Sequence, residues 1–244
     1  MSTGEAPGVV RGDLSPLLGE GESTGSNGRA RRDRDLNPAP RTGRWVQLVP
    51  LTAEYEEFAY RLAVDEVTGV RWRLGGSVPT PEAHREHLIA GAFNQFVVLE
   101  RRTSVPIGHL ISYGVDLNHG IGYVGGAMVD EAQASGLGIE ATYLYLRYLF
   151  ETYRLRKLYF EMPEYNLGQM AGGVGTIMKE EGRLRDHSYY GGRLWDRVFL
   201  ALYREDVMAL SLKELGRRKK LRTEGVVDPE EGQASAKGVT PTKH

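Results

Sequence analysis

The stretch from Val129 to Ala141 constrains the fold more than any other, because it joins an apolar run to a long helical pattern through two glycines. Gly136 and Gly138 permit backbone angles and close approaches that a Cβ would block. From Ile139 to Tyr153 apolar residues recur at helical spacing, which predicts an amphipathic helix with one buried face. The first N–H groups of such a helix are unpaired and carry the positive end of its dipole. The stretch therefore predicts either a phosphate-binding turn or a helix start that binds nothing.

The glycine pattern Gln133-x-x-Gly136-x-Gly138 does not match two familiar nucleotide-binding signatures. No Gly-Lys-Ser/Thr follows it, so it is not a Walker loop. The dinucleotide fingerprint needs three glycines and an acidic residue about 20 positions later, and that order is also missing. The order and spacing of these residues need another explanation.

The remaining pattern predicts an α+β fold, with a single mixed, mostly antiparallel sheet flanked by helices. Short turns between the second, third and fourth predicted strands imply an antiparallel meander, and Gly191-Gly192 predicts the turn of a closing hairpin. Thr80 followed by Pro81 is a clear helix start. The predicted strands are 45–51, 95–101, 107–115, 120–129, 157–162, 182–189 and 193–203, and the predicted helices are 54–64, 80–92, 139–153, 169–180 and 207–215.

Composition separates two tails from a central domain. Residues 1–43 are rich in Gly, Pro, Ser, Glu and Arg, and we expect them to be disordered. Residues 44–206 form the predicted domain, and residues 207–244 are expected to begin as a helix and end as a disordered tail. The basic clusters in the tails, 29–34 and 217–222, are most simply solvated segments, and contact with a nucleic acid is the alternative.

Charge and cysteine content exclude several classes of protein. The net charge of −1 favours neither nucleic-acid nor membrane binding. Without cysteine the chain has no disulfide, no thiolate metal site and no cysteine acyl-enzyme. His84 and His87 lack a third ligand that would make a zinc site, so no metal is expected. No apolar run approaches the roughly 18 residues of a membrane span, and the N-terminus lacks a signal-peptide pattern. A soluble, cytoplasmic protein is expected.

Several fragments, taken together, resemble the GCN5-related N-acetyltransferase superfamily over roughly residues 45–204. The glycine pattern is similar to the acyl-CoA pyrophosphate loop of that superfamily, and the closer likeness is to its ribosomal-protein N-acetyltransferase branch. The other fragments are Ile107-Gly108, Ile121-Gly122-Tyr123, Glu161 with Asn166, Glu181-Gly182-Arg183-Leu184-Arg185, and Gly192-Arg193 before Asp196. The resemblance implies an acetyl-CoA-dependent N-acetyltransferase in which an amine attacks the bound thioester directly.

The resemblance implies which segments hold acetyl-CoA. Backbone N–H groups of the turn would cradle the pyrophosphate, and part of the preceding strand would pair with the pantetheine as though it were an added strand. Asn166 would lie near the pantetheine, although an Asx turn is the alternative for this residue. Gly125 and Gly126 would clear space for the thioester, or would only relieve crowding in the sheet. The implied cofactor-binding residues are Ala127, Met128, Val129, Gln133, Ala134, Ser135, Gly136, Leu137, Gly138, Ile139 and Asn166.

For catalysis, the resemblance makes Glu161 the base that takes a proton from the amine. The alternative is an edge charge or an ion pair with Lys157 or Arg154. Relatives carry a general acid, a tyrosine seven residues after the asparagine or a serine three after it, where this chain has Gly173 and Gln169. Another group, or water, must then protonate the thiolate, and Tyr165 is taken as the candidate acid. His187, Tyr189 and Tyr190 are further candidates.

Trp72 and Arg73 lie where relatives build the acceptor wall, although ordinary packing is the alternative for Trp72. His109 is either a cleft-wall or a core histidine. The expected partner is an amine, either a peptide or protein α-amino group or a small molecule such as an amino sugar, an amino acid or an antibiotic. A second copy of the chain, as in a homodimer, is left open. Because the general acid is missing, a non-catalytic acyl-CoA-binding protein is the alternative function.

Overall fold

The structure is a computed structural model, and it describes residues 39, 41–170, 173–175 and 177–211. The predictions for residues 1–38 and 212–244, which include both basic clusters, lie outside these described residues. The division into two tails and a domain stays a prediction. Within the described part, Arg41 and Gly43 make main-chain hydrogen bonds with Leu48 and Val46 of the first strand.

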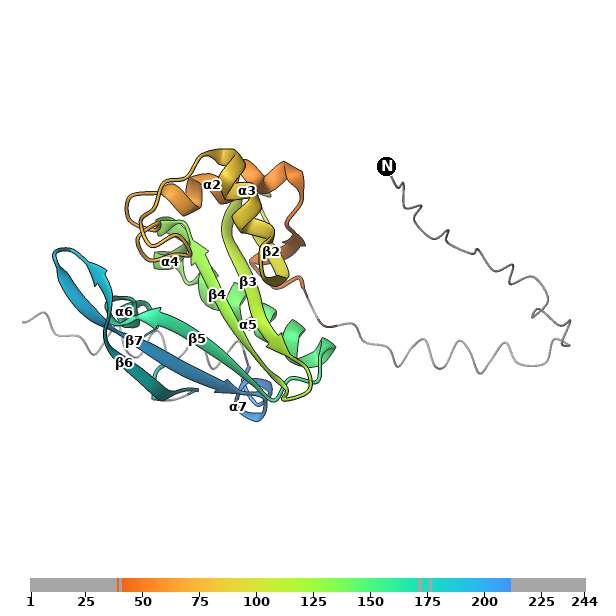
Figure 1. The fold of residues 1–244 in the computed structure, drawn as a ribbon. Helices are drawn as coiled ribbons and strands as arrows, with labels where there is room; N and C mark the ends of the chain where they lie inside the picture. Colours follow the sequence, from red (N-terminus) through yellow and green to blue (C-terminus); the bar gives the residue numbers. More distant parts are fainter. Residues whose placement is uncertain (1–38, 40, 171–172, 176, 212–244) are drawn as a thin grey trace, which may run out of the picture. The chain divides into compact units, whose positions relative to one another are not determined.

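The described residues form one mixed seven-stranded sheet in the order β1-β2-β3-β4-β5-β7-β6 (Figure 1). Neighbouring strands run antiparallel, except that β4 and β5 are parallel. This arrangement confirms the predicted fold class and the meander of β2, β3 and β4. The strands are β1 (Val46–Pro50), β2 (Ala92–Glu100), β3 (Pro106–Asp116), β4 (Ile121–Met128), β5 (Lys157–Pro163), β6 (Met178–Tyr190) and β7 (Arg193–Tyr203).

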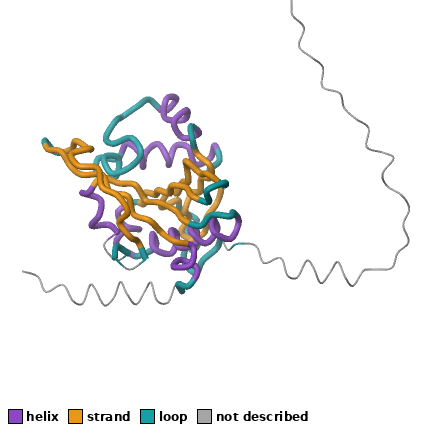
Figure 2. Tube along the Cα trace, turned by 60° about the horizontal axis from the view of Figure 1, so that its bottom comes forward, coloured by secondary structure: helices purple, strands orange, loops and turns teal. Residues whose placement is uncertain are grey.

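Helices lie on both sides of the sheet (Figure 2). The long helix α5 packs on one face, where Leu144, Tyr145 and Phe150 join the main core with strand residues such as Val124. Helices α2 and α3 cover the opposite face of the sheet, near β2 and β3. Their buried side chains are therefore not part of the main core. The helical segments are η2 (Ala53–Tyr55), α2 (Glu56–Val64), α3 (Pro81–Ile89), α4 (Asp130–Ser135), α5 (Leu137–Thr152), η3 (Glu164–Asn166), α6 (Leu167–Met170) and α7 (Arg204–Met208).

Strand β5 shows why the sequence pattern predicts the sheet correctly. Successive side chains of a strand point to opposite faces. Leu158, Phe160 and Met162 are accordingly buried in the core, while Tyr159 and Glu161 are half-buried on the other face. The face that carries Glu161 is the one on which polar and aromatic side chains gather.

The helix predicted over 169–180 is wrong. Residues 164–170 form only the short segments η3 and α6, and β6 already begins at Met178. Gly175 has a left-handed φ of +77°, which a helix does not accommodate, and Met178 is buried against the core. Glycines and a buried strand residue therefore override a helical pattern that was itself weak.

Several other boundaries also differ from the prediction; for example, β2 starts at Ala92 rather than 95, and two helices have different ends. Helix α3 starts as expected, with the Thr80 hydroxyl accepting a hydrogen bond from the Ala83 N–H, but it ends at Ile89 because Gly91 turns the chain with φ +70°. The C-terminal helix α7 starts at Arg204 rather than 207 and ends at Met208. Residues 209–211, which the sequence pattern predicts to be helical, are not, and the rest of that predicted helix, 212–215, lies outside the described residues.

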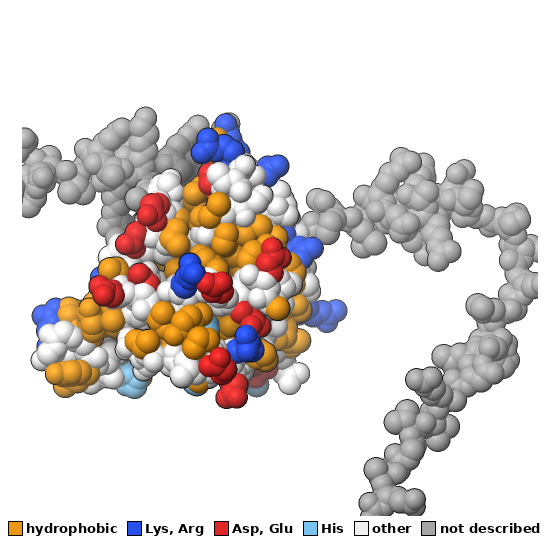
Figure 3. Space-filling view, turned by 90° about the horizontal axis from the view of Figure 1, so that it is seen from above, with side chains coloured by type: hydrophobic (Ala, Val, Ile, Leu, Met, Phe, Trp, Pro, Cys, Tyr) orange, Lys and Arg blue, Asp and Glu red, His pale blue; other side chains and the backbone are white. Residues whose placement is uncertain are grey.

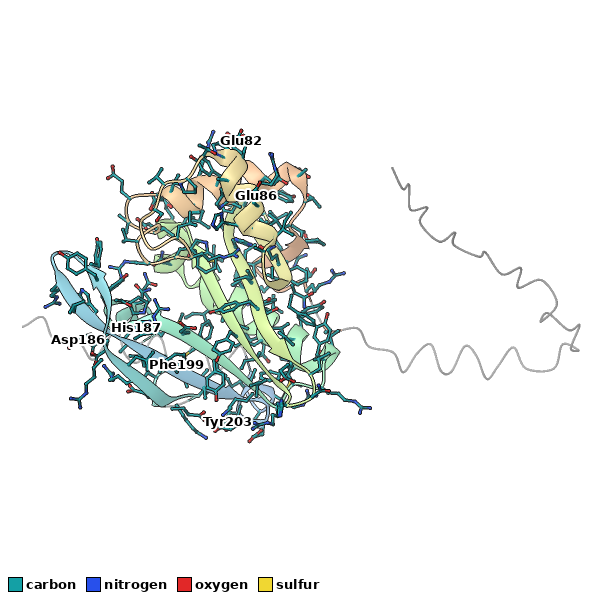
Figure 4. The ribbon with its side chains drawn as sticks, viewed as in Figure 1. Glu82, Glu86, Asp186, His187, Phe199 and Tyr203 are labelled. Atoms are coloured by element: carbon teal, nitrogen blue, oxygen red, sulfur yellow. The ribbon has the colours of Figure 1, made fainter. Side chains whose placement is uncertain are left out.

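The closing hairpin of β6 and β7 is confirmed, and it projects from the side of the sheet (Figure 1). Gly191 and Gly192 both have positive φ, 61° and 80°, as a tight hairpin turn requires. Strand β6 shifts register between Leu184 and Ser188, and Asp186 at this bend also has a positive φ, 50°. Figure 4 shows Asp186 and His187 at the bend and Phe199 and Tyr203 along β7.

In the described part of the chain, no helix combines the length and the apolar character needed to cross a membrane. On the face seen in Figure 3, acidic and basic side chains are interspersed among hydrophobic ones. This face does not present the continuous basic surface that nucleic-acid binding favours.

Candidate active site

The site is built where β4 and β5 part. Their parallel pairing runs from Ile121 and Lys157 to Val124 and Phe160 and then stops. Strand β4 continues beside β3 to Met128, and β5 continues beside β7 to Pro163 (Figure 1). Among the described residues, no strand pairs with the edge of β4 that faces β5 over Gly125–Met128. Backbone groups on such an edge can pair with an extended ligand.

The glycine stretch follows directly at the same end of β4, but it is more helical than expected. Residues 130–135 form α4, Gly136 turns the chain with φ 87°, and α5 begins at Leu137 instead of Ile139. The only conformation that needs glycine here is that of Gly136. Gly138 lies in the first turn of α5, where an added Cβ would stand 3.3 Å from Met128 Cγ. The turn thus places the first turn of α5 directly on the last residue of β4.

The side chain of Gln133 also points back to β4, since its Nε2 donates to the Met128 carbonyl at 2.9 Å. Its Oε1 accepts from Gln169 of α6 at 3.3 Å, so the two amides join the segments that follow β4 and β5. Gln169 stands at the position where the resemblance implies a serine acid, and an amide has no acidic proton to give.

Gly125 and Gly126 are both crowded. An added Cβ on Gly126 would lie 2.5 Å from Leu110 Cδ2, and one on Gly125 would lie 3.3 Å from Trp72 Cζ3. A larger residue at either position would therefore require Leu110 or Trp72 to move, which fits the alternative that these glycines relieve crowding. That these glycines also clear space for a thioester stays a prediction.

Glu161 lies on β5 beyond the last residue paired with β4. Its Oε1 accepts a hydrogen bond from Arg197 of β7 at 2.5 Å, and the side chains are 22% and 32% exposed. Lys157 and Arg154 are the alternative partners expected for Glu161. Lys157 instead forms an ion pair with Glu181 at 2.7 Å, and Arg197 is the residue that pairs with Glu161. Arg197 also donates to Ser188 at 3.4 Å. Glu161 is therefore a fixed carboxylate with partial access to solvent.

A row of three tyrosines runs beside Glu161 on the same face of the sheet. Tyr123 lies between Tyr113 and Tyr159, with stacked rings whose centroids are 5.5 Å apart on each side. Burial raises the pKa of Tyr113 to about 12, and the nearby charge of Glu161 acts in the same direction. The row gives the site an aromatic floor over β3, β4 and β5.

Asn166 and Tyr165 hold the segment between α2 and α3 against the end of β5. The Asn166 amide accepts from the Arg71 guanidinium at 3.2 Å and donates to the Arg71 carbonyl at 3.0 Å. The Tyr165 hydroxyl donates to the Val70 carbonyl at 2.9 Å. Asn166 thus makes side-chain bonds to a distant segment, which differs from the Asx turn considered above. To serve as an acid, Tyr165 must first release Val70.

Trp72 contacts His109, which is completely buried, so of the two alternatives for His109 the structure shows the core histidine. The substrate-binding role of Trp72, Arg73 and His109 stays a prediction. The rings of Trp72 and His109 meet edge to face at 5.8 Å, and Arg73 donates to the His87 carbonyl at the end of α3. Burial lowers the pKa of His109 to about 3, assisted by the charge of Arg73, so the imidazole is neutral.

The surrounding bonds fix the tautomer of His109. Gln95 donates to the Leu88 carbonyl at 2.7 Å, so its Oε1 accepts from His109 Nε2 at 3.0 Å. His109 Nδ1 has no hydrogen-bond partner among the described residues. In this arrangement His109 supports Trp72 from beneath and does not itself face solvent.

The remaining candidate acids lie on or near the hairpin. Tyr190 packs on Tyr165 with ring centroids 5.1 Å apart, while Tyr189 and His187 are exposed. Gly173, at the position of the tyrosine acid, offers no side chain. None of these placements supplies a free acid beside Glu161.

Sequence reasoning did not identify Arg197 or Arg71, which bind two of the predicted residues. Arg197 lies 36 positions from Glu161, and Arg71 lies 95 positions from Asn166. The alternation of β7 places Arg197 on the face of Phe199, but only the register of β7 on β5 brings it to Glu161. The sequence carries no signal for the contact with Arg71.

Among the described residues, no group of three or more His, Asp or Glu side chains could hold a metal ion. His84 is buried against Tyr60, with ring centroids 5.4 Å apart, whereas His87 is exposed and bonds to the Ala83 carbonyl. The two histidines thus point to different surroundings.

Comparison with known proteins gives no match to any family model. No curated protein matches by sequence either. Solved structures do match. Spermidine N-acetyltransferase from Vibrio cholerae in complex with CoA and spermine aligns with a TM-score of 0.57 and 18% identity, covering 68% of this chain and 99% of that one. A protein provisionally named as an acetyltransferase aligns with a TM-score of 0.57 and 22% identity, covering 78% and 96% of the two chains. At these identities the likeness establishes the fold, a mixed seven-stranded sheet of the acetyltransferase type.

Proposed function

We propose that this chain is an N-acetyltransferase of the GCN5-related type, which transfers an acetyl group from acetyl-CoA to a primary amine. One observation carries the proposal. Strands β4 and β5 pair over four positions and then diverge, and the glycine turn into α5 stands at the end of the unpaired edge. The fold shared with N-acetyltransferases, one of them in complex with CoA and spermine, supports this interpretation.

The residues at this edge fit an acyl-CoA. The Val129 N–H already donates to the Ile107 carbonyl at 2.9 Å, and successive residues of a strand direct their main-chain groups to alternate edges, so the main chain of Met128, between Ala127 and Val129, would pair with the pantetheine. The turn from Gln133 to Ile139 would bind the pyrophosphate at the positive end of α5. Gln133 to Ser135 lie in α4. For the pyrophosphate to bind, either their amides must leave their helical hydrogen bonds, or the amides of the first turn of α5 must be the ones that bind it. Asn166 would act by holding Arg71 beside the pantetheine.

The reaction needs no covalent enzyme intermediate. The lone pair of a neutral amine attacks the thioester carbonyl, the C–S bond breaks, the nitrogen loses a proton and the thiolate gains one. Glu161 would accept the proton of the amine, because its Oε1 is held by Arg197 while Oε2 has no bond within the described residues. Tyr165 would return a proton to the thiolate after releasing the Val70 carbonyl.

Two classes of amine remain as acceptors. The spermine bound by a structural neighbour supports a small cationic amine. The likeness of the sequence to the ribosomal-protein branch supports a peptide or protein α-amino group. The wall of the acceptor site would be built by Trp72 and Arg73, with His109 behind Trp72. A cytoplasmic location is part of this proposal, and the absence of cysteine from the sequence is compatible with a reducing compartment.

A second candidate function is favoured by the missing acid. Gly173 and Gln169 stand where relatives carry tyrosine or serine, and the Tyr165 hydroxyl is engaged with Val70. A protein with this site could bind acyl-CoA without turning it over and act as a sensor.

The test has two steps on the intact chain. Calorimetric titration with CoA and with acetyl-CoA measures binding, and release of free thiol from acetyl-CoA across a panel of polyamines, amino sugars, amino acids and peptides measures turnover. Binding with turnover supports the enzyme, and binding without turnover on any amine supports the sensor. Absence of binding to both coenzymes overturns both functions.

A further inference from the structure

Trp72 stands over the point where β4 and β5 part. It lies on the segment between α2 and α3, and its Cζ3 and Cη2 atoms are 3.3 and 3.7 Å from where a Cβ on Gly125 would be. Gly125 is the first residue of β4 beyond the last pair with β5, Val124 and Phe160. The indole therefore covers the narrow end of the unpaired edge.

The position of Trp72 is fixed from several sides. The neighbouring Arg71 donates to both the Tyr165 carbonyl and the Asn166 amide oxygen at 3.2 Å. The Trp72 carbonyl accepts a hydrogen bond from the Gly75 N–H at 3.0 Å. Its ring rests on the buried His109, which Gln95 holds in turn. These bonds fix the main chain that carries Trp72, and the contact with His109 supports its ring, so the indole acts as a wall.

The opposite face of the sheet is closed at the same level. Val124 is 2% exposed and Phe160 is 5% exposed, and both belong to the main core. A pantetheine that pairs along Gly125–Met128 brings its thioester to this narrow end. An acyl chain that continues beyond the thioester then meets the core on one face and Trp72 on the other.

We infer that Trp72 limits the length of the acyl group that this protein accepts from CoA. The inference rests on the proposed binding of acyl-CoA and adds the class of donor: acetyl fits under the indole, and chains of several carbons do not. Trp72 is thus a residue that determines donor specificity. Arg71 and Asn166 act through it as positioning residues.

Binding measured without an acceptor amine tests this directly. The intact chain is titrated in a calorimeter with CoA, acetyl-CoA, butyryl-CoA and octanoyl-CoA, and so are the variants Trp72→Ala and Trp72→Leu. The matched control is Trp45→Ala, because Trp45 is 56% exposed at the start of β1. Thermal unfolding of each variant shows that it is folded, and the leucine variant serves if the alanine variant is not.

The native protein and the Trp45 variant are expected to bind octanoyl-CoA at least roughly tenfold more weakly than acetyl-CoA, which is the scale of mismatch in an apolar pocket. Loss of the indole is expected to remove this difference and leave the affinity for CoA itself unchanged. Equal affinity of the native protein for all four ligands, or an unchanged preference in both Trp72 variants, would overturn the inference while leaving the proposed function intact. Failure of the native protein to bind CoA overturns the proposed function, and the inference with it.

Discussion

Glu161 and Arg197 lie on the neighbouring strands β5 and β7, and the guanidinium of Arg197 donates to Glu161 Oε1 at 2.5 Å. A charge-assisted bond of this kind holds the carboxylate in one orientation. Its second oxygen is left to act on a ligand. The pair therefore turns an isolated acidic residue on an otherwise apolar strand into a positioned group.

Replacing Glu161 by Gln tests its role as base. The amide keeps the size of the side chain and can still accept from Arg197, but it cannot take a proton. We expect turnover with an accepted amine to fall by about 100-fold or more, with the dissociation constant for CoA unchanged. The matched control is Glu164→Gln, whose carboxylate, in η3, pairs with Arg183 of β6 at 2.8 Å. Equal losses of turnover in Glu161→Gln and Glu164→Gln would show that Glu161 is not the base.

Replacing Gly136 by Ala tests the turn between α4 and α5. The φ of 87° places an alanine in the left-handed region, at a cost of about 1–2 kcal/mol in the free energy of unfolding. Gly168→Ala is the control, because nothing lies within 4 Å of its added Cβ and its φ is not positive. Urea denaturation should show a loss only for Gly136→Ala, and calorimetry should show weaker binding of CoA by that variant. Equal stability of the two variants contradicts the strained turn.

Asn166→Ala tests the bond between η3 and the segment that carries Trp72. The amide is buried and makes two bonds to Arg71, so its loss removes both and leaves the Arg71 carbonyl without this donor, while the guanidinium keeps its bond to the Tyr165 carbonyl. We expect the free energy of unfolding to fall by about 1–3 kcal/mol. Asn118→Ala, at an exposed turn, should change it by less than about 0.5 kcal/mol. If Asn166→Ala leaves the free energy of unfolding unchanged, this contact does not hold the segment that carries Trp72.

Glu181 makes the stability of the protein depend on pH. Burial acts to raise its pKa, but bonds from Lys157, Tyr203 and Tyr159 outweigh burial and lower the pKa from 4.5 to about 2. The stabilisation from this group is therefore fully present above about pH 4.5 and is lost as the pH falls toward about 2. The difference in urea midpoint between the native protein and Glu181→Gln should be constant from neutral pH to pH 5, and should narrow below that. A difference that stays constant down to pH 3 contradicts the lowered pKa.

The sequence predicted the sheet well because the signals for it are local. Alternating apolar residues on β5, short turns in the meander and Gly191-Gly192 at the hairpin each specify a conformation through neighbours in the chain. The prediction of a helix over 169–180 was wrong because the local signal there was weak. The glycines weakened the helical pattern of this segment. Met178 instead begins β6 and is buried in the core, and this long-range packing is not visible in the local pattern.

The sequence alone thus determined the fold class, the glycine turn at the start of α5 and the face of β5 on which Glu161 lies, since all three follow from periodicity and backbone sterics. Only the tertiary structure decided that Arg197 binds Glu161, that Arg71 binds Asn166 and that Trp72 covers Gly125. These contacts join residues far apart in the chain. They depend on the register of strands and the path of a loop, which long-range packing sets and local pattern does not encode.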